Sequence, residues 1–260
     1  MAAGYLAPDG ATILGTCIKT TVDMAALVNA TTARYIKAND VYARYKPGYM
    51  HGHPSDVIMP LLGVAEHTHA SGRECLTAIV LAYEIYLGLC DAVRNGGFDP
   101  AGFGCIAVAA GAGRLLGLNL EQLSHAIANA AVPNVMLKQV RTDHLTPWKA
   151  HAAGYAGKAG VFAAQLARAG AVGPHLPFEG ESGWCAHVAG QRFSLTLPFA
   201  GGYKMLGARI KPRLARAGDS SDHGSGKVTC LTGPTSACCA RAGRSAPQRQ
   251  ARYARRTLVT

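Results

Sequence analysis

Alanine and glycine are concentrated in two stretches of the chain that also carry helix signals. They occupy six of the seven residues in 107–113 and seven of the nine in 152–160. Small side chains let the axes of two helices approach closely. No alternation of strand and helix patterns accompanies these stretches. The sequence therefore predicts an all-α fold, a compact helical bundle rather than a layer of helices covering a sheet.

Start and stop signals place six helices between Asp23 and Gly170. Ser71 with Glu74, and Asn119 with Gln122, match the capping box, in which two residues satisfy each other's unpaired backbone N–H groups. Glycine after a helical pattern, as at Gly117, is typical of a left-handed stop. The predicted helices run from the cap Asp23 through Tyr35, from Val57 to Glu66 with Ser55 and Asp56 as caps, from Gly72 to about Val93, from Pro100 to Gly117, from Asn119 through Ala131, and from Thr146–Pro147 to Gly170.

The composition and the periodicity of the sequence change after Gly170. Residues 171–206 are rich in loop signals, with a short strand predicted at Arg192–Leu197. Beyond Pro212 the chain is Arg, Ser, Gly and Ala without periodicity, so residues 213–260 are expected to be disordered. We therefore predict a helical domain over residues 1–206 and a basic, low-complexity tail over residues 207–260.

The formal net charge of +11 lies mostly in this tail. From Ala208 to Thr260 there are eleven lysines and arginines against two aspartates, a net of +9, so residues 1–207 carry only +2. A basic tail can bind nucleic acid or acidic lipid without specificity. This one has a single aromatic residue, Tyr253, and no helical face, and a reading-frame change or a wrongly assigned exon would give the same abrupt shift. We do not expect nucleic acid to be a partner.

The cysteines and the N-terminal residues of the sequence indicate the cellular compartment. None of the eight cysteines forms the two-residue spacing of a zinc or redox motif, which favours a reducing compartment. The start lacks a basic region followed by an apolar one, so no signal peptide is predicted. The longest apolar run, Cys75–Cys90, contains Glu84 and is too short to span a bilayer. We expect a cytoplasmic protein without a membrane partner, or a mitochondrial one if a targeting segment precedes this sequence.

Polar residues converge on one loop, from Asn39–Asp40 to His53, Ser55 and Asp56. A helix start with free backbone donors favours an anion such as a substrate carboxylate. The alternative is that Ser55 and Asp56 only cap the helix and that His53 is an ordinary loop histidine. The histidines at 51, 53, 67 and 69 do not have the spacing of a zinc-protease motif, so no metal site is predicted.

Lys149 is the second candidate, because it falls in the first turn of a predicted helix. A cation there faces the positive end of the helix dipole and needs a compensating partner. A bound carboxylate or Asp143 would serve, with His144 and His151 close in sequence; the alternative is a solvated lysine. The third candidate is the basic cluster from Tyr203 to Lys211, which would either pair with acidic substrate groups or be a solvated segment.

In order, these segments resemble the MmgE/PrpD family, which includes 2-methylcitrate dehydratases and cis-aconitate decarboxylases, over roughly Ala11 to Lys211. No single piece is specific, but the ordered series is. The similar stretches are Ala26–Thr31, Arg34–Ile36, Asn39–Asp40, His53–Asp56, Thr77–Val80, Tyr83–Glu84, Gly97–Asp99, Arg114–Leu118, Trp148–Lys149, Gly160–Ala164 and Phe178–Gly180.

The resemblance implies a lyase that needs no cofactor and no metal. It implies an active site between a large helical domain and a smaller α/β domain, acting on a tricarboxylic or alkylcitrate-like acid by dehydration, or alternatively by decarboxylation. It also favours a homodimer. The residues it assigns are His53, Lys149 and Asp40 as catalytic groups and Lys211, Arg141 and Ser55 as substrate-binding groups, while the role of Asp99 stays open.

The sequence also departs from the family pattern. Lys37 stands where the family usually has an aspartate, and Val41 where it has a threonine, so a carboxylate and a hydroxyl are absent from the site. The chain is expected to begin inside the helical domain and to lack most of the α/β domain from Arg213. A second hypothesis follows: a truncated, non-catalytic fragment or pseudoenzyme that associates with itself through its helical domain.

Overall fold

The computed structural model describes residues 5–36, 38–43, 51–94, 97–144 and 146–210. The chain divides into two compact units, residues 1–214 and 215–260. The second unit lies outside the described residues, as does the predicted disorder of residues 213–260. The predicted boundary between residues 206 and 207 stays a prediction, and the fold below is that of the first unit.

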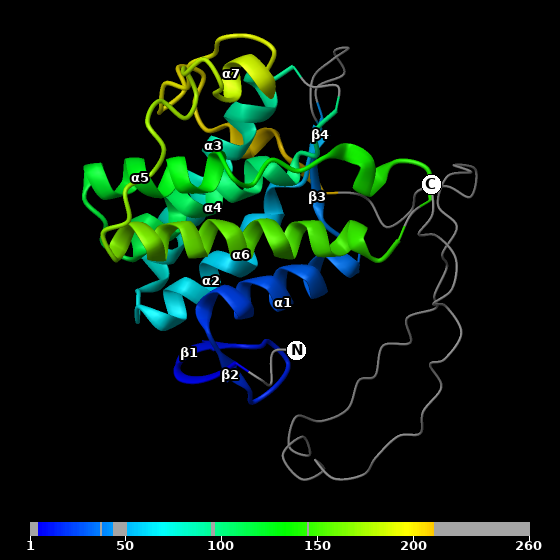
Figure 1. Cartoon of the computed structure of the whole chain (residues 1–260). Helices are drawn as coiled ribbons and strands as arrows, with labels where there is room; N and C mark the ends of the chain where they lie inside the picture. Colours follow the sequence, from blue (N-terminus) through cyan, green and yellow to red (C-terminus); the bar gives the residue numbers. More distant parts are fainter. Residues whose placement is uncertain (1–4, 37, 44–50, 95–96, 145, 211–260) are drawn as a thin grey trace, which may run out of the picture. The chain divides into compact units, whose positions relative to one another are not determined.

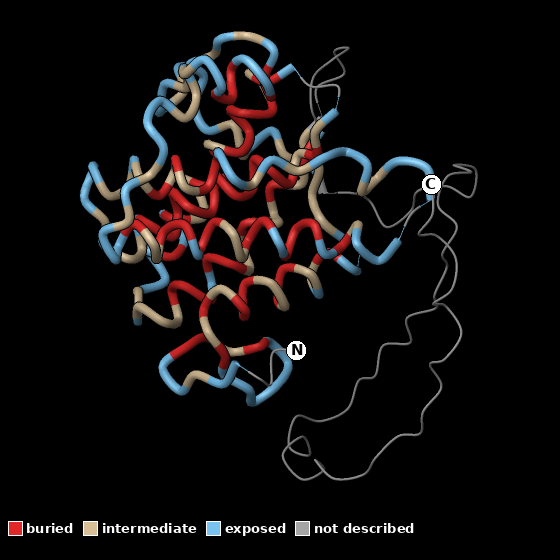
Figure 2. Tube along the Cα trace, viewed as in Figure 1, coloured by how far each residue is buried: buried red, intermediate tan, exposed pale blue. Residues whose placement is uncertain are grey.

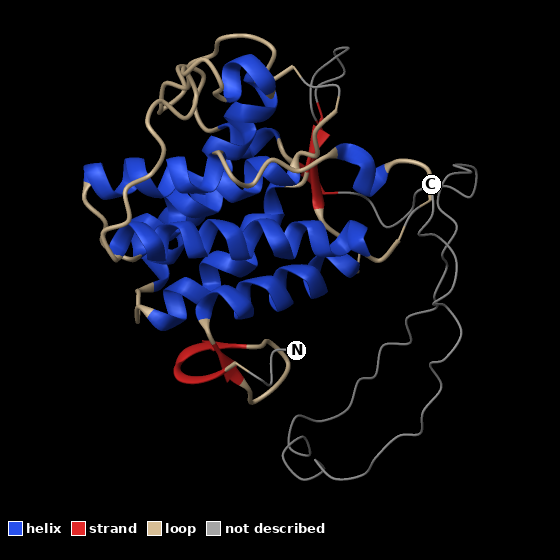
Figure 3. Cartoon of the chain, viewed as in Figure 1, coloured by secondary structure: helices blue, strands red, loops and turns tan. Residues whose placement is uncertain are grey.

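Helices dominate the first unit, and the predicted all-α class is confirmed (Figures 1 and 3). All six predicted helices are present close to their expected bounds, and the described residues add a short seventh. The helices are α1 (Val22–Tyr35), α2 (Ile58–His67), α3 (Gly72–Ala92), α4 (Ala101–Leu115), α5 (Leu120–Ala131), α6 (Trp148–Arg168) and α7 (Trp184–His187), with 3-10 turns η2 (Pro54–Val57), η3 (Lys138–Arg141) and η4 (Lys204–Gly207).

Helix α4 lies at the centre of the core, and α6 packs between it and α1 (Figure 2). Residues 101–113 of α4 are all buried. At the α1–α6 contact a Cβ on Gly154 would overlap the carbonyl oxygen of Leu27, and at the α4–α6 contact one on Gly160 would lie 2.6 Å from the carbonyl oxygen of Cys105. The small residues therefore set the helix spacing, as their clustering in the sequence predicts.

Two small sheets accompany the helices in the described part of the chain. Strands β1 (Leu6–Thr12) and β2 (Lys19–Thr20) form an antiparallel pair beside α2. In the second sheet β3 (Asp40–Ala43) is the middle strand, flanked by β4 (His51–Gly52) and β5 (Arg209–Ile210), both antiparallel to it. The second sheet thus brings the end of the described chain next to Asp40.

The strand predicted at Arg192–Leu197 was wrong, because this segment is irregular in the structure. Its apolar side chains alternate as they would in a strand, but the segment pairs with no strand among the described residues. Phe193 packs against the core, and Leu195 lies beside Gly88 of α3. The alternation in this segment therefore reflects packing on the core rather than pairing in a sheet.

The two capping boxes are confirmed, with reciprocal hydrogen bonds at Ser71–Glu74 and Asn119–Gln122. Gly117 and Gly170 both have positive φ, as predicted for helix stops. Other caps were wrong: Thr21, not Asp23, precedes α1, and α2 begins after Val57 because Ser55 and Asp56 lie in η2. The polar groups of Ser55 and Asp56 have partners far away in the sequence, described below.

Helix α3 is long and apolar enough to cross a membrane by length and composition alone, since it extends beyond the run Cys75–Cys90. In the structure 56% of its most apolar window is buried inside the protein, and α3 packs against α4. This is the behaviour of a core helix.

Candidate functional site

Asp40, at the start of β3, is held at both carboxylate oxygens. The backbone N–H of Ser55 donates to Oδ1 at 3.0 Å, and the hydroxyl of Tyr83 donates to Oδ2 at 3.0 Å. Two donors to one carboxylate fix its direction and stabilise its negative charge. Asp40 therefore joins β3, where it lies, to η2 and to α3.

His53 lies beside Asp40, and its protonation is set by a backbone oxygen. Its Nδ1 is 2.6 Å from the carbonyl oxygen of Asp40. A carbonyl oxygen only accepts hydrogen bonds, so Nδ1 carries a proton, and Nε2 is the basic nitrogen whenever the ring is neutral. The backbone N–H of His53 also donates to the hydroxyl of Tyr86 at 3.3 Å. The half-buried ring is thus oriented with a basic nitrogen, as a proton acceptor requires.

A buried ion pair lies behind this loop. Nη1 of Arg34 on α1 is 3.5 Å from Oδ1 of Asp56, and both side chains are less than a tenth exposed. Burial raises the pKa of Asp56 to about 6, although the charges of Arg34 and Arg141 lower it; Asp40 and Asp99 also raise it. These influences show that two guanidinium groups and three carboxylates share one region of the fold.

Arg141 ends η3 and holds Asp99 through two hydrogen bonds, one from Nε to Oδ2 and one of 3.1 Å from Nη2 to Oδ1. Burial alone would lower the pKa of Arg141, but the hydrogen bond and the charge of Asp99 outweigh it and raise the pKa. Asp99 in turn accepts the backbone N–H of Ala101 at 2.8 Å, at the start of α4. Arg141 therefore stays charged while it is anchored at the N-terminus of the central helix.

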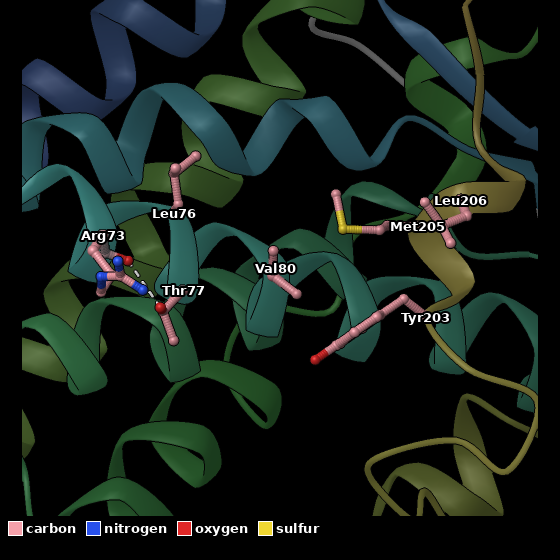
Figure 4. A pocket seen from close by; sticks show the side chains of 7 residues that line it. All are labelled: Arg73, Leu76, Thr77, Val80, Tyr203, Met205 and Leu206. Atoms are coloured by element: carbon pink, nitrogen blue, oxygen red, sulfur yellow. Dashed lines mark hydrogen bonds between the residues drawn. The ribbon is translucent and has the colours of Figure 1, made fainter.

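A groove of about 630 Å³ lies elsewhere, between α3 and η4 (Figure 4). Apolar side chains dominate it, and Asp40, His53, Asp56 and Arg141 are not among the residues around it. The groove is lined by Arg73, Leu76, Thr77, Val80, Tyr203, Met205 and Leu206. It is thus separate from the polar cluster around Asp40.

A family comparison covers the whole of this cluster. The model of the MmgE/PrpD N-terminal domain matches residues 1–196, which contain every residue of the polar cluster around Asp40. The chain belongs to the MmgE/PrpD family. The resemblance seen in the ordered sequence segments is therefore confirmed over three quarters of the chain.

The chain is also similar to a curated protein. The chain is 28% identical over 153 residues to a probable 2-methylcitrate dehydratase of Saccharomyces cerevisiae (strain ATCC 204508 / S288c). The aligned part is 53% of this chain and 29% of the relative. The chain thus spans less than a third of the length of that relative.

Among the residues that family resemblance singles out, the structure brings Asp40, His53 and Ser55 together. Nδ2 of Asn39 lies 3.4 Å from Oγ of Ser55, while Oδ1 of Asn39 is buried without a hydrogen-bond partner among the described residues. Val41, which replaces the usual family threonine, is half-buried in β3 opposite Arg209. Lys37 lies outside the described residues.

Lys149 lies in the first turn of α6, as predicted, and is half-buried. Asp143, the acidic partner considered for it, accepts a hydrogen bond from Nε2 of Gln139 at 3.1 Å. Helix α6 contacts both η2 and η3, the turns that carry Ser55 and Arg141. A role of Lys149 in the site stays a prediction, and Lys211 lies outside the described residues.

Within the basic cluster from Tyr203 to Lys211, Lys204 makes contacts that neither of the two sequence predictions includes. Nζ of Lys204 is 2.7 Å from Oδ2 of Asp91 and 4.2 Å from the centre of the Phe199 ring. Only a fifth of the Lys204 side chain is exposed. Lys204 is therefore neither a freely solvated lysine nor a cation directed at an acidic substrate.

Three residues of the site escaped sequence reasoning, namely Tyr83, Tyr86 and Arg34. The two tyrosines are three positions apart on α3, so their hydroxyls reach Asp40 and the backbone of His53 from the same face of one helix. Tyr83 and Arg34 occur in stretches that resemble the family, but resemblance assigned them no role. The spacing of the tyrosines was a usable signal, although it equally suits two core residues.

Proposed function

We propose that the cluster around Asp40 and His53 binds a polycarboxylate of the 2-methylcitrate class and takes part in its dehydration. The observation that carries the proposal is the 2.6 Å contact from His53 Nδ1 to the Asp40 carbonyl oxygen. It leaves Nε2 as the basic nitrogen of a half-buried ring. Membership of the MmgE/PrpD family supports the same class of chemistry.

The proposed reaction removes a proton and a hydroxyl group from adjacent carbons. Nε2 of His53 takes the proton from the carbon next to a substrate carboxylate, and the released electron pair forms the new double bond. The bond to the hydroxyl oxygen breaks, this oxygen takes up a proton from solvent and leaves as water, and His53 then returns its own proton to solvent. A cation near the carboxylate, the role proposed for Lys149, stabilises the enolate-like charge that develops.

The second candidate function is a non-catalytic protein that associates with itself. It is favoured by an aromatic stripe on α6 (Trp148, Tyr155 and Phe162), where residues seven apart are each about half exposed. Residues at this spacing lie on one helix face. A homodimer through this stripe should dissociate in the Tyr155→Asp variant, as measured by light scattering, whereas the Leu120→Asp change at an exposed site on α5 should have no such effect.

The decisive experiment incubates the purified chain with 2-methylcitrate and with citrate. Product formation is followed through ultraviolet absorbance of the conjugated alkene and through proton NMR, and released carbon dioxide is measured to detect decarboxylation. We expect dehydration without carbon dioxide, and a loss of roughly a hundredfold or more in rate in His53→Asn.

His69→Asn is the matched control, because His69 is exposed and has a left-handed backbone that asparagine tolerates. It should leave the rate unchanged. Binding of the unreactive tricarboxylate tricarballylate without any turnover would favour the non-catalytic candidate. If the chain neither binds tricarballylate nor converts 2-methylcitrate, the proposed function is wrong.

A further inference from the structure

Glu84 is a buried carboxylate on α3 that holds the backbone of η4. Its Oε2 accepts the N–H of Lys204 at 3.0 Å and its Oε1 accepts the N–H of Met205 at 2.9 Å. Only 5% of Glu84 is exposed. Hydrogen bonds to a buried, charged acceptor are stronger than those between neutral groups. Glu84 thus joins α3 to a segment 120 residues away.

Apolar contacts hold η4 only weakly. Leu206 is 83% exposed and Tyr203 is 60% exposed. Both line one wall of the open groove on α3, and Figure 4 shows them beyond Val80 along that helix. Of the η4 side chains, Met205 packs against the core in part. Polar tethers to α3 therefore account for most of what fixes η4 in place.

A second set of hydrogen bonds joins the same helix to both η4 and β3. The carboxylate of Asp91 accepts a hydrogen bond from Nζ of Lys204 at 2.7 Å and from the hydroxyl of Tyr42 at 3.1 Å. Tyr42 lies on β3, two residues after Asp40. Helix α3 therefore fixes the positions of η4 and β3 relative to each other.

The position of η4 decides where β5 lies. Only Leu206, Gly207 and Ala208 separate Met205 from Arg209, the first residue of β5. In the antiparallel pair, Asp40 lies opposite Ile210 and Val41 lies opposite Arg209. A shift of η4 along α3 would therefore move the strand that pairs with Asp40, whose carbonyl oxygen sets the proton on His53.

We propose that Glu84 is a positioning residue for the Asp40–His53 pair, acting through η4 and β5. Its two hydrogen bonds set the register of β5 on β3 and thereby keep the Asp40 carbonyl oxygen opposite Nδ1 of His53. Glu84 does not itself touch the proposed substrate. The effect on turnover rests on the proposed function, but the effect on the tautomer of His53 does not.

The test compares Glu84→Gln with Glu66→Gln. Glutamine puts an NH2 donor in place of one carboxylate oxygen, so one of the two backbone N–H groups that Glu84 binds would face a donor. Glu66 is a suitable control because its carboxylate also receives a backbone N–H, from Thr12 at 2.8 Å, but it joins α2 to β1. Nitrogen-15 NMR of the histidine rings reports which nitrogen of His53 carries the proton, and no substrate is needed.

We expect Glu84→Gln to lose the single Nδ1–H tautomer of His53 and to show a mixture of both tautomers. The Glu66→Gln variant should keep the wild-type signal. If the chain dehydrates 2-methylcitrate, kcat should fall roughly ten- to a hundredfold in Glu84→Gln with little change in KM, because the base is misplaced while binding groups remain.

Hydrogen exchange in the unmodified protein gives a second measurement that does not depend on the variant folding. The amides of Lys204 and Met205 should open together with those of β3 and β5, as one cooperative unit. Independent opening of η4, or an unchanged His53 tautomer in a folded Glu84→Gln protein, would overturn the inference. If the tautomer of His53 changes in Glu84→Gln but the wild-type protein shows no turnover, the role of Glu84 is supported and only the proposed function is contradicted.

Discussion

The hydroxyl of Tyr83 lies 3.0 Å from Oδ2 of Asp40, a contact between residues 43 positions apart. Burial raises the pKa of Tyr83 far above its ordinary value, and the neighbouring charge of Asp40 raises it further. Tyr83 therefore keeps its proton and always acts as the donor in this hydrogen bond. The contact joins the core helix α3 directly to the candidate site.

Replacing Tyr83 with phenylalanine should weaken the fold. The Asp40 carboxylate would keep the Ser55 N–H but lose its second donor, at a cost of about 1 to 3 kcal/mol in the free energy of unfolding. Urea denaturation measures this. Tyr35→Phe, at a site that is 69% exposed, should change stability by less than about 0.5 kcal/mol. Equal effects of the two substitutions would contradict the assigned hydrogen bond.

The stability of the protein should fall as the pH rises through the titration of Asp56. Burial raises the pKa of Asp56 from 3.8 to about 6, so the folded state binds this proton more tightly than the unfolded state. The contribution is complete below pH 3.8 and is lost as the pH rises through about 6. Its size is on the order of 3 kcal/mol.

The Asp56→Asn variant isolates this contribution, because its amide oxygen still accepts a hydrogen bond from Arg34 but no longer titrates. Its free energy of unfolding should decline less than that of the wild type between pH 4 and pH 7, whatever the difference between the two proteins at any single pH. Denaturant titrations at a series of pH values measure both curves. Parallel curves would show that Asp56 ionises at its ordinary pKa.

Local signals in the sequence determined much of the fold. The capping boxes at Ser71 and Asn119 depend on residues three apart, and the glycine stops depend on one residue each, so both are visible in a short window. The small residues of α6 likewise indicate close packing before any partner helix is known. These features account for the agreement between the predicted and observed helices.

The partners within the site could not be predicted in this way, because they are set by the tertiary fold. Ser55 and Asp56 look like helix caps in the sequence. In the structure, the Asp40 carboxylate accepts the N–H of Ser55. The carboxylate of Asp56 instead forms an ion pair with Arg34. The order of residues in the sequence does not show which distant residue pairs with each of these groups. The resemblance of ordered segments located Asp40 and His53, yet the tautomer of His53 follows only from the observed contact with a carbonyl oxygen.

The contact between α1 and α6 should not tolerate a larger residue at Gly154. A Cβ there would overlap the carbonyl oxygen of Leu27 and the hydroxyl of Thr31, and backbone atoms cannot rotate away. Gly154→Ala should therefore reduce the free energy of unfolding by about 1 to 3 kcal/mol. Thermal and urea denaturation measure the change.

Gly72→Ala is the matched control for this prediction. Gly72 is the first residue of α3, and a Cβ there would meet nothing within 4 Å. Alanine restricts the unfolded chain more than glycine does, so this variant should be about as stable as the wild type or more stable by up to about 1 kcal/mol. A Gly154→Ala protein as stable as Gly72→Ala would show that α1 and α6 are not in such close contact.

Binding of tricarballylate should depend on Lys149 if the proposed site is correct. Trp148, next to it, is 49% exposed, whereas Trp184 is buried and donates a hydrogen bond to the carbonyl oxygen of Ala131. Tryptophan fluorescence should therefore report events near Lys149. Losing a charged hydrogen bond costs about 1.5 to 3 kcal/mol, so Lys149→Met should raise Kd roughly ten- to a hundredfold.

Lys158→Met provides the comparison, since Lys158 lies on the same helix 4.0 Å from Asp23 and away from its first turn. That variant should bind tricarballylate with the Kd of the wild type. Weaker binding in Lys149→Met alone would identify Lys149 as a residue that contacts the ligand, whereas equal Kd values for the two variants would rule out this role.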